Sequence, residues 1–512
     1  MNGHLRVDWR ASLSLTGRVL LYLAVPLSIP VVTALIYGEG WLPFLVTIGV
    51  TTVVGFSLSK LDDERDLGAR EGFLMVAVTW LAVALIGTIP YLLAEHGTAS
   101  TLTWPNVPNA LFESMSGFTT TGATVMGDIG VEYHSHALLL WRQLTQWLGG
   151  MGIVVLAVAI LPELSVGGAQ LMDAEAPGPG IEKLTPRIAE TARVLWIAYF
   201  AFTVLEMVLL YGLHLAGFAD GMTLFNAISH GLTTLPTGGF SPEAYSIEAF
   251  SAAVQWVIIP FMVVAGTNFA LFWGLVQGNP RSLLADEEFR FYTGVMASLT
   301  AVVTMVLFVG SSLPGTVGLA GLEESLRHGL FQVVSIVTTT GYASFDFNGW
   351  TATAQYLLLF GMFLGGSAGS TGGAIKMVRW LVIIKSIKRE LFTTVHPEAI
   401  KPVRLGGRAL DESAVRGIHA FTLLYLALFF LGVVVLMLDA GRIGMELQVL
   451  DGMSAVAATI GNVGPGFGVV GPMENYELFP WTSKLLMVFL MWIGRLEIFP
   501  VLVLLTRAYW RS

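Results

Sequence analysis

Long apolar windows constrain this chain more than any other feature of its sequence. A transmembrane helix needs about 20 mainly apolar residues, and windows of that length recur from end to end. They fall near residues 15–37, 41–59, 72–94, 136–161, 191–216, 248–276, 290–313, 352–384, 414–438 and 479–506. The composition agrees, because 54% of the 512 residues are hydrophobic and only 12% are charged. The sequence therefore predicts an all-α membrane protein with ten transmembrane helices.

The first apolar window is expected to remain in the protein as a helix. It follows the basic residues Arg6, Arg10 and Arg18, it is long enough to span a bilayer, and it has no small-residue cleavage site. The chain contains no cysteine, which excludes disulfides, thiolate catalysis and Cys-based metal sites.

Four shorter apolar segments are too short to cross a bilayer, and each runs straight into a loop rich in Thr and Gly. They lie near residues 106–118, 222–234, 322–337 and 446–459. We interpret them as re-entrant pore half-helices, each placed between two spans, so that the chain contains a fourfold internal repeat. The predicted division is an extra helix pair over 1–70 and pore repeats over 71–180, 181–285, 286–405 and 406–512.

Positive charge predicts the orientation of these repeats. Most Lys and Arg residues, including the basic run 376–416, lie in segments that would share the cytoplasmic side with both termini. The Thr/Gly loops then lie on the outer side with many acidic residues, such as Glu95, Asp128 and Glu323. An acidic face can raise the local concentration of cations, although a solvated surface without a function explains the same charge.

The Thr/Gly loops have the composition of an ion-coordinating backbone. They read FTTTGATV (118–125), TTLPTGGFS (233–241), TTTGYASFD (338–346) and GNVGPGFG (461–468). Non-helical backbone at membrane depth must be buried in protein or line a water-filled cavity. Glycine permits positive φ without a side chain, and rings of carbonyl oxygens can replace the hydration shell of a cation. Four such loops predict one central path for a monovalent cation.

The arrangement resembles the superfamily of K⁺ transporters that includes the Trk, Ktr and Hkt proteins, and within it the bacterial TrkH/TrkG-type subunits. The resemblance covers nearly the whole chain and rests on the four loops, on GGSAGSTGGAIK (365–376) and on the extra N-terminal helix pair. It implies potassium uptake across the bacterial inner membrane through a pseudo-fourfold pore. The implied K⁺ filter residues are Thr120, Thr121, Gly122, Pro236, Thr237, Gly238, Thr339, Thr340, Gly341, Asn462, Val463 and Gly464.

The second and fourth loops depart from the family pattern. Leu235 and Pro236 stand where the first and third loops have Thr, so the glycine that matches Gly122 is Gly238 or Gly239. The fourth loop replaces TTTG by GNVG over 461–464.

A gate below the filter is a further expectation. Its residues are Gly365, Gly366, Ser367, Gly369, Gly372, Gly373 and Arg495. The small residues of 365–373 would break their span and obstruct the pore, or instead allow close helix packing through Gly361 and Gly365. An Arg within a span costs about 2.5–3.5 kcal/mol and should face protein or water. By resemblance Arg495 faces the pore, and the alternative is a salt bridge to Glu206.

Other residues suggest an enzymatic, ion-binding or structural role. GGSAG (365–369) formally matches a nucleophile elbow, but it lies in a predicted span without a nearby His, so the chain is not expected to be an enzyme. Glu113 and Asp451 are either ion ligands or proton carriers, or partners of filter backbone and half-helix starts. His134, His136, His230 and His328 are expected to be structural.

The alternative function is a secondary transporter that couples Na⁺ or H⁺ to a small solute, a class that usually shows inverted repeats. The resemblance further implies a homodimer and cytoplasmic TrkA-type nucleotide-binding regulatory subunits. The basic stretch 376–416 could dock them, although the positive-inside rule explains most of its charge. We expect no nucleic acid partner and no cofactor besides the transported K⁺.

Overall fold

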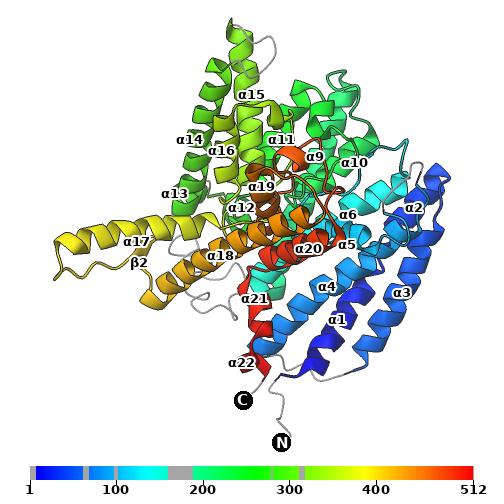
Figure 1. Ribbon diagram of the computed structural model, residues 1–512, viewed down its shortest axis with the longest axis horizontal. Coiled ribbons are helices and arrows are strands. Elements are labelled where there is room, and N and C mark those ends of the chain that lie inside the picture. The colour runs from blue at the N-terminus through cyan, green and yellow to red at the C-terminus, as the bar shows by residue number, and fades with distance from the viewer. Residues whose placement is uncertain are drawn as a thin grey trace, which may run out of the picture.

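The computed structural model describes residues 7–61, 68–96, 102–159, 188–276, 278–279, 281–310 and 318–510. Helices make up almost all regular structure in these ranges (Figure 1). One short hairpin pairs β1 (Arg404–Leu405) with β2 (Arg408–Ala409). Gly406 and Gly407 turn it with φ of 55° and 82°, conformations that glycine adopts without steric cost.

The helices follow the predicted order of an N-terminal pair and four repeats. The N-terminal helices are α1 (Trp9–Leu23), α2 (Ser28–Tyr37) and α3 (Leu42–Ser59). The first predicted repeat contains α4 (Ala69–Leu93), α5 (Val107–Phe118) and α6 (His136–Ala159). The second contains α9 (Ile188–Leu215), α10 (Leu224–Thr234), η1 (Ser246–Ala249), α11 (Ala252–Ala265), α12 (Phe269–Val276) and α13 (Arg281–Ala285).

The third predicted repeat contains α14 (Glu287–Val309), α15 (Gly318–Val337), η2 (Phe347–Gly349), α16 (Ala352–Gly361) and α17 (Met377–Val395). The fourth contains α18 (Glu412–Arg442), α19 (Val449–Ile460), η3 (Gly468–Val470), α20 (Trp481–Arg495), α21 (Phe499–Leu502), η4 (Val503–Leu505) and α22 (Arg507–Trp510). The boundaries of the four repeats stay a prediction.

Six helices in the described ranges are long and apolar enough to cross a bilayer. They are 9–37, which joins α1 and α2, and α3, α4, α9, α14 and α18. The other four predicted windows fall on α6 and on three interrupted pairs, α11 with α12, α16 with α17, and α20 with α21. The last pair is bent by 113°. The protein is therefore a helical membrane protein, and the count of ten spans stays a prediction.

The four half-helix segments are helical and end where the Thr/Gly loops begin. These are α5, α10, α15 and α19, which contain 12, 11, 20 and 12 residues. The third is longer than predicted, because its described part starts at Gly318 and not at 322. Asp451 belongs to a capping box with Gln448 at the start of α19, so it satisfies backbone N–H groups there.

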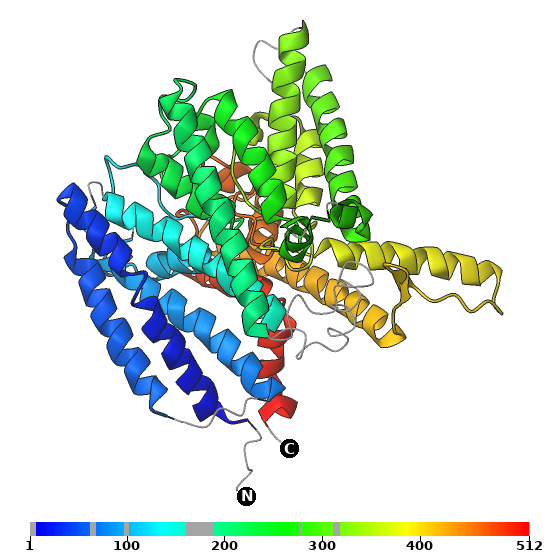
Figure 2. The ribbon, with the colours of Figure 1, turned by 180° about the vertical axis from the view of Figure 1, so that it is seen from behind.

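Figures 1 and 2 show how the repeats are arranged. The N-terminal helices α1 and α3 lie along one edge beside α4, and α17 projects away from the body on the opposite side. Both ends of the described chain lie together, since Val7 and Tyr509 share one small buried apolar cluster.

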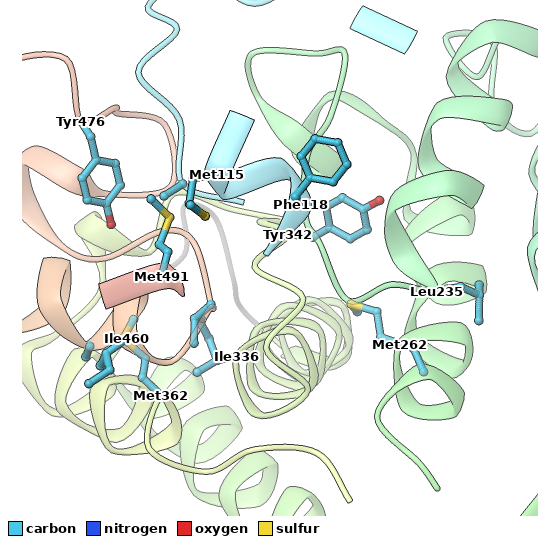
Figure 3. Packing of buried hydrophobic residues seen from close by; sticks show 14 of the residues in the cluster. Met115, Phe118, Leu235, Met262, Ile336, Tyr342, Met362, Ile460, Tyr476 and Met491 are labelled. Carbon is cyan, nitrogen blue, oxygen red and sulfur yellow. The ribbon is translucent and has the colours of Figure 1, made fainter. Parts of the chain in front are cut away.

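Apolar side chains from all four predicted repeats pack between the half-helices and the helices that follow them. Figure 3 labels ten of these buried residues: Met115, Phe118, Leu235, Met262, Ile336, Tyr342, Met362, Ile460, Tyr476 and Met491. Burial of such side chains is the main force that stabilises the packing between protein segments that lipid does not reach. This layer positions the four loops.

Candidate functional site

The four Thr/Gly loops share one backbone conformation. Each starts with a residue other than glycine in the left-handed region: Thr120, Thr237, Thr339 and Asn462 have φ of 50°, 53°, 60° and 53°. Two positions later each loop has a glycine with positive φ, of 82° at Gly122, 79° at Gly239, 81° at Gly341 and 106° at Gly464. Positive φ is rare for β-branched residues such as Thr. Such strain, repeated in register, indicates a site under functional constraint.

Hydrogen bonds give the same register. The amide that follows each left-handed residue donates to the carbonyl five positions before it. These bonds run from Thr121 to Ser116, Gly238 to Thr233, Thr340 to Ser335 and Val463 to Ala458, at 2.8, 2.9, 2.8 and 2.8 Å. They satisfy carbonyls that the end of a helix leaves unpaired.

The register corrects the expected second loop by one residue. Gly239, and not Gly238, occupies the position of Gly122, so the equivalent triplet is Thr237, Gly238 and Gly239 instead of Pro236 to Gly238. The reason is local, since Leu235 keeps a right-handed helical conformation as the C-cap of α10. Pro236 therefore continues the turn at the end of the half-helix.

The four loops meet in a closed ring. A Cβ atom on any of the four positive-φ glycines would come within 3.0 Å of a backbone carbonyl oxygen of the next loop. The contacts run from Gly122 to Gly238, from Gly239 to Thr340, from Gly341 to Val463 and from Gly464 to Thr121. Each of these carbonyls belongs to the residue directly before the positive-φ glycine of its own loop. The chain thus returns from the fourth loop to the first, as a single pore requires.

The predicted gate segment 365–373 is non-helical and lies against the ends of three half-helices. The Thr371 hydroxyl donates to the carbonyl of Leu235 at 2.9 Å, which is the C-cap of α10. The Gly373 amide donates to the Thr339 hydroxyl at 2.7 Å. A Cβ at Gly373 would lie within 3.0 Å of the carbonyl oxygen of Gly461, the C-cap of α19. The segment is therefore a break beside the Thr/Gly loops, and not a packed helix seam.

The other predicted gate residues hold the shape of this segment. The amides of Gly365 and Ser367 donate to the carbonyls of Ile375 and Gly266 at 2.9 and 2.8 Å. Gly369 has φ of 70° and faces Asn268. A Cβ at Gly366 or Gly372 would crowd Gly266 or Thr338.

Arg495 lies beside this segment. Its Nη1 donates to the carbonyl of Thr371 at 2.7 Å, and the side chain is 2% exposed. Its Nε and Nη2 have no hydrogen-bond partner among the described residues. The alternative salt bridge to Glu206 is not formed, and both carboxylate oxygens of Glu206 lack a partner within the described ranges. The guanidinium thus adds a buried positive charge next to the break.

Several residues that support the site were missed by reasoning from the sequence. Glu288 of α14 accepts from the amides of Ala368 and Val378 at 2.8 and 3.0 Å, which joins the gate segment to the start of α17. Lys376 donates to the carbonyl of Gly372. No local pattern identifies these residues, because their partners are distant in sequence or are backbone atoms.

Glu113 and the four histidines form hydrogen bonds with other protein groups. Glu113 accepts from the amide of Val125 at 3.0 Å, as expected for a partner of filter backbone. His136 has an acidic neighbour, Glu39, at 2.7 Å, which the sequence spacing does not reveal. Burial lowers the pKa of His134 to about 4, on the loop before α6. Within the described ranges no cluster of three potential ligands could hold a metal ion.

Comparisons with known proteins agree with this geometry. The family model described as TrkH, cation transport protein, matches residues 42–511. The chain is 37% identical over 512 residues to the Trk system potassium uptake protein TrkH of Escherichia coli strain K12, covering 99% of this chain and 100% of that protein. It is 34% identical over 493 residues to TrkG of the same strain, covering 94% and 95%.

The crystal structure of the potassium transporter TrkH from Vibrio parahaemolyticus matches with a TM-score of 0.84. The identity to that protein is 34%, and the match covers 98% of this chain and 100% of the other.

Proposed function

The chain belongs to the TrkH family of cation transport proteins, and on this premise we propose that it takes up K⁺ through one filter formed by its four Thr/Gly loops. The matched relatives are potassium transporters and not enzymes, and this chain is likewise no enzyme. K⁺ is the transported ion in this proposal, and no cofactor takes part.

The ring of glycine-to-carbonyl contacts is the observation that carries the proposal. Four loops with one backbone conformation, each touching the next, support a single path with fourfold carbonyl lining. The half-helices end at the same ring, so their C-terminal dipoles place partial negative charge there. The filter triplets are Thr120 to Gly122, Thr237 to Gly239, Thr339 to Gly341, and Asn462 to Gly464.

The gate consists of segment 365–373 and Arg495. The segment contacts the ends of α10, α15 and α19, which supports a steric block directly below the filter. The unpartnered N–H groups of Arg495 support an electrostatic barrier to cations at the same depth. Opening would require the segment to leave these contacts.

The protein spans the bacterial inner membrane ten times in this proposal, with four re-entrant half-helices and both termini in the cytoplasm. The shared cluster of Val7 and Tyr509 supports a common side for the two ends. The exposed apolar stripe of Ile384, Ile387, Leu391 and Val395 on the projecting α17 supports a homodimer. TrkA-type subunits would bind the basic stretch 376–416.

Uptake into liposomes tests the proposal. Purified protein should take up Rb⁺ in competition with K⁺ and only weakly with Na⁺. Gly341→Ser should abolish most of this discrimination, because the new Cβ would strike the carbonyl of Val463 and φ of 81° strains any side chain. Gly349→Ser is the matched control, since a Cβ at Gly349 meets nothing within 4 Å.

Two outcomes would contradict the proposal. An unchanged ratio of K⁺ to Na⁺ uptake in Gly341→Ser would show that this ring is not the filter. Uptake of an amino acid or sugar driven by a Na⁺ or H⁺ gradient would favour the secondary transporter instead.

A further inference from the structure

The outer arm of each filter loop is tied back to its own half-helix, and the four ties differ in chemistry. Each joins a side chain seven or eight positions before the left-handed residue to a group four or five positions after it. The pairs are Glu113 with the Val125 amide, His230 with the Ser241 hydroxyl, Gln332 with the Ser344 amide, and the Ser454 hydroxyl with the Phe467 amide, at 3.0, 3.1, 2.8 and 2.8 Å.

Only the first of these ties includes a charged acid, Glu113, and this acid is paired with a base, Arg142. Glu113 is 0% exposed, and Nε of Arg142, which is 2% exposed, donates to its Oε1 at 2.6 Å. Burying an ion pair has a large desolvation cost. In the third repeat, neutral Gln332 makes the equivalent bond to a loop amide. The tie itself therefore needs no charge, and the buried pair must serve another purpose.

Arg142 extends the first tie to the second loop. Its Nη1 donates to the carbonyl of Ser241 at 2.9 Å, and its guanidinium lies over the ring of Phe240, 3.5 Å from the centroid. A planar guanidinium can bond two acceptors and stack at once, which a lysine cannot. One side chain of α6 thereby joins the ties of loops one and two.

Gln146, one turn further along α6, grips the second loop next to the ring. Its Nε2 donates to the carbonyl of Gly238 at 2.7 Å, and its Oε1 accepts from the amide of Phe240 at 3.1 Å. The carbonyl of Gly238 is the one that faces Gly122 in the ring. The position of α6 is thus coupled directly to the seam between the first and second loops.

The other seams have neutral contacts. The Asn348 Nδ2 donates to the carbonyl of Gly468 at 3.2 Å between the third and fourth loops. The Tyr476 amide donates to the carbonyl of Thr124 at 2.8 Å between the fourth repeat and the first loop. Among the salt bridges of the described ranges, only Glu113 with Arg142 joins a filter tie. The second loop, with its Pro and its two glycines, is the one that receives this additional support.

We propose that the Glu113–Arg142 pair is a specificity-determining element that holds the first and second filter loops in register. Its role is positioning: it touches no ion, and it keeps the carbonyl of Gly238 at its place in the ring. This inference rests on the proposed filter. Without the pair, the second loop can shift and the ring can contract around Na⁺, so discrimination falls while the fold is kept.

The double variant Glu113→Gln with Arg142→Met tests the pair. Gln can keep the bond to the Val125 amide, as Gln332 does in the third repeat, and Met fills the space of the arginine stem without leaving a buried unpaired charge. The ratio of K⁺ to Na⁺ uptake in liposomes should fall roughly tenfold. The matched control is Asp439→Asn with Arg442→Met, an ion pair at the end of α18, which should leave the ratio unchanged.

Arg142→Lys is a second variant that should fold readily. Lysine keeps the charge beside Glu113 but cannot also reach Ser241 and stack on Phe240, so the ratio should fall by roughly threefold. Full discrimination in this variant, or in the folded double variant, would overturn the proposal.

Thermal unfolding gives a readout that does not depend on flux. A filter that binds K⁺ stabilises the folded protein in K⁺ relative to Na⁺, by mass action. The double variant should lose this K⁺-specific shift in Tm, whereas the control keeps it. If Gly341→Ser lowers the uptake ratio and the double variant does not, the positioning role is wrong and the filter stands. If the wild-type protein does not distinguish K⁺ from Na⁺ either, the proposed filter itself is wrong.

Discussion

The four Thr/Gly loops have nearly the same backbone, whereas the helices that follow them differ from one another. All four loops place a left-handed residue and a positive-φ glycine at the same spacing, although their sequences range from TTTG to GNVG. After them, α6 is continuous over His136–Ala159, α11 and α12 are separated at 266–268, α16 and α17 are separated at 362–376, and α20 and α21 by a bend of 113°.

This difference follows from what each region has to do. A ring of carbonyls needs four equal contributions, because one displaced loop changes every ion-to-oxygen distance. A path below the ring needs only one obstruction to be closed. Unequal helices therefore suit a gate, and equal loops suit a filter.

The largest effect is expected where the loops are most alike. Gly239→Ser should lower the ratio of K⁺ to Na⁺ uptake by tenfold or more, because φ of 79° disfavours a side chain and its Cβ would crowd the Thr340 carbonyl. Gly238→Ser should cost only about threefold, because φ of Gly238 is not positive, although its Cβ would displace the side chain of Gln146. If Gly238→Ser has the larger effect, Gly238 and not Gly239 is the functional equivalent of Gly122.

The next effect concerns the asymmetric region. Arg495→Ala should raise basal K⁺ flux about fivefold in the absence of cytoplasmic subunits, because the buried positive charge disappears from the path. Arg495→Lys should stay near wild type, since the charge remains. A lower flux in Arg495→Ala, restored by Arg495→Lys at equal protein levels, would make the arginine a structural residue.

A smaller effect is expected for Thr371→Val. The substitution removes the bonds to the carbonyls of Leu235 and Ala265, at 2.9 and 3.0 Å, and keeps the backbone carbonyl that Arg495 contacts. The one hydroxyl proton is shared between these two carbonyls, so its loss weakens the closed position by about 0.5 kcal/mol and basal flux should rise about twofold. If basal flux and the ratio of K⁺ to Na⁺ uptake are both unchanged, the hydroxyl of Thr371 does not help to hold the gate closed.

Nucleotides are expected to have no effect on this chain alone. ATP or NADH should leave flux through this chain alone unchanged in liposomes, because the only sequence resembling a phosphate-binding loop, GSTGGAIK, lacks the Ser or Thr after Lys376. Addition of the cytoplasmic subunits should make flux respond. A nucleotide response of the chain alone would place regulation within the membrane protein.

The sequence predicted the helices that lead into the four Thr/Gly loops and one of the three breaks. The expected segment 106–118 became α5, Val107–Phe118, and 446–459 became α19, Val449–Ile460, because apolar runs that end in Thr and Gly are strong local signals. Segment 365–373 was found through its small residues. The break at 266–268 and the bend after Arg495, where Glu497 and Ile498 have φ of 57° and 62°, carry no comparable run.

By itself the sequence determined that the chain lies in a membrane and which four loops could replace water around a cation, since hydropathy and the need for glycine are local properties of a segment. The register of the second loop became known only from the structure, where it follows from the local conformation of Leu235. The closure of the ring and the contact of Arg495 with Thr371 were decided by the tertiary structure alone. The last two features depend on atoms that are more than 100 residues apart, such as Arg495 with Thr371, and Asn462 with Thr121, whose Nδ2 and Oγ1 lie 2.9 Å apart. Packing brings such pairs together, and no local pattern encodes them.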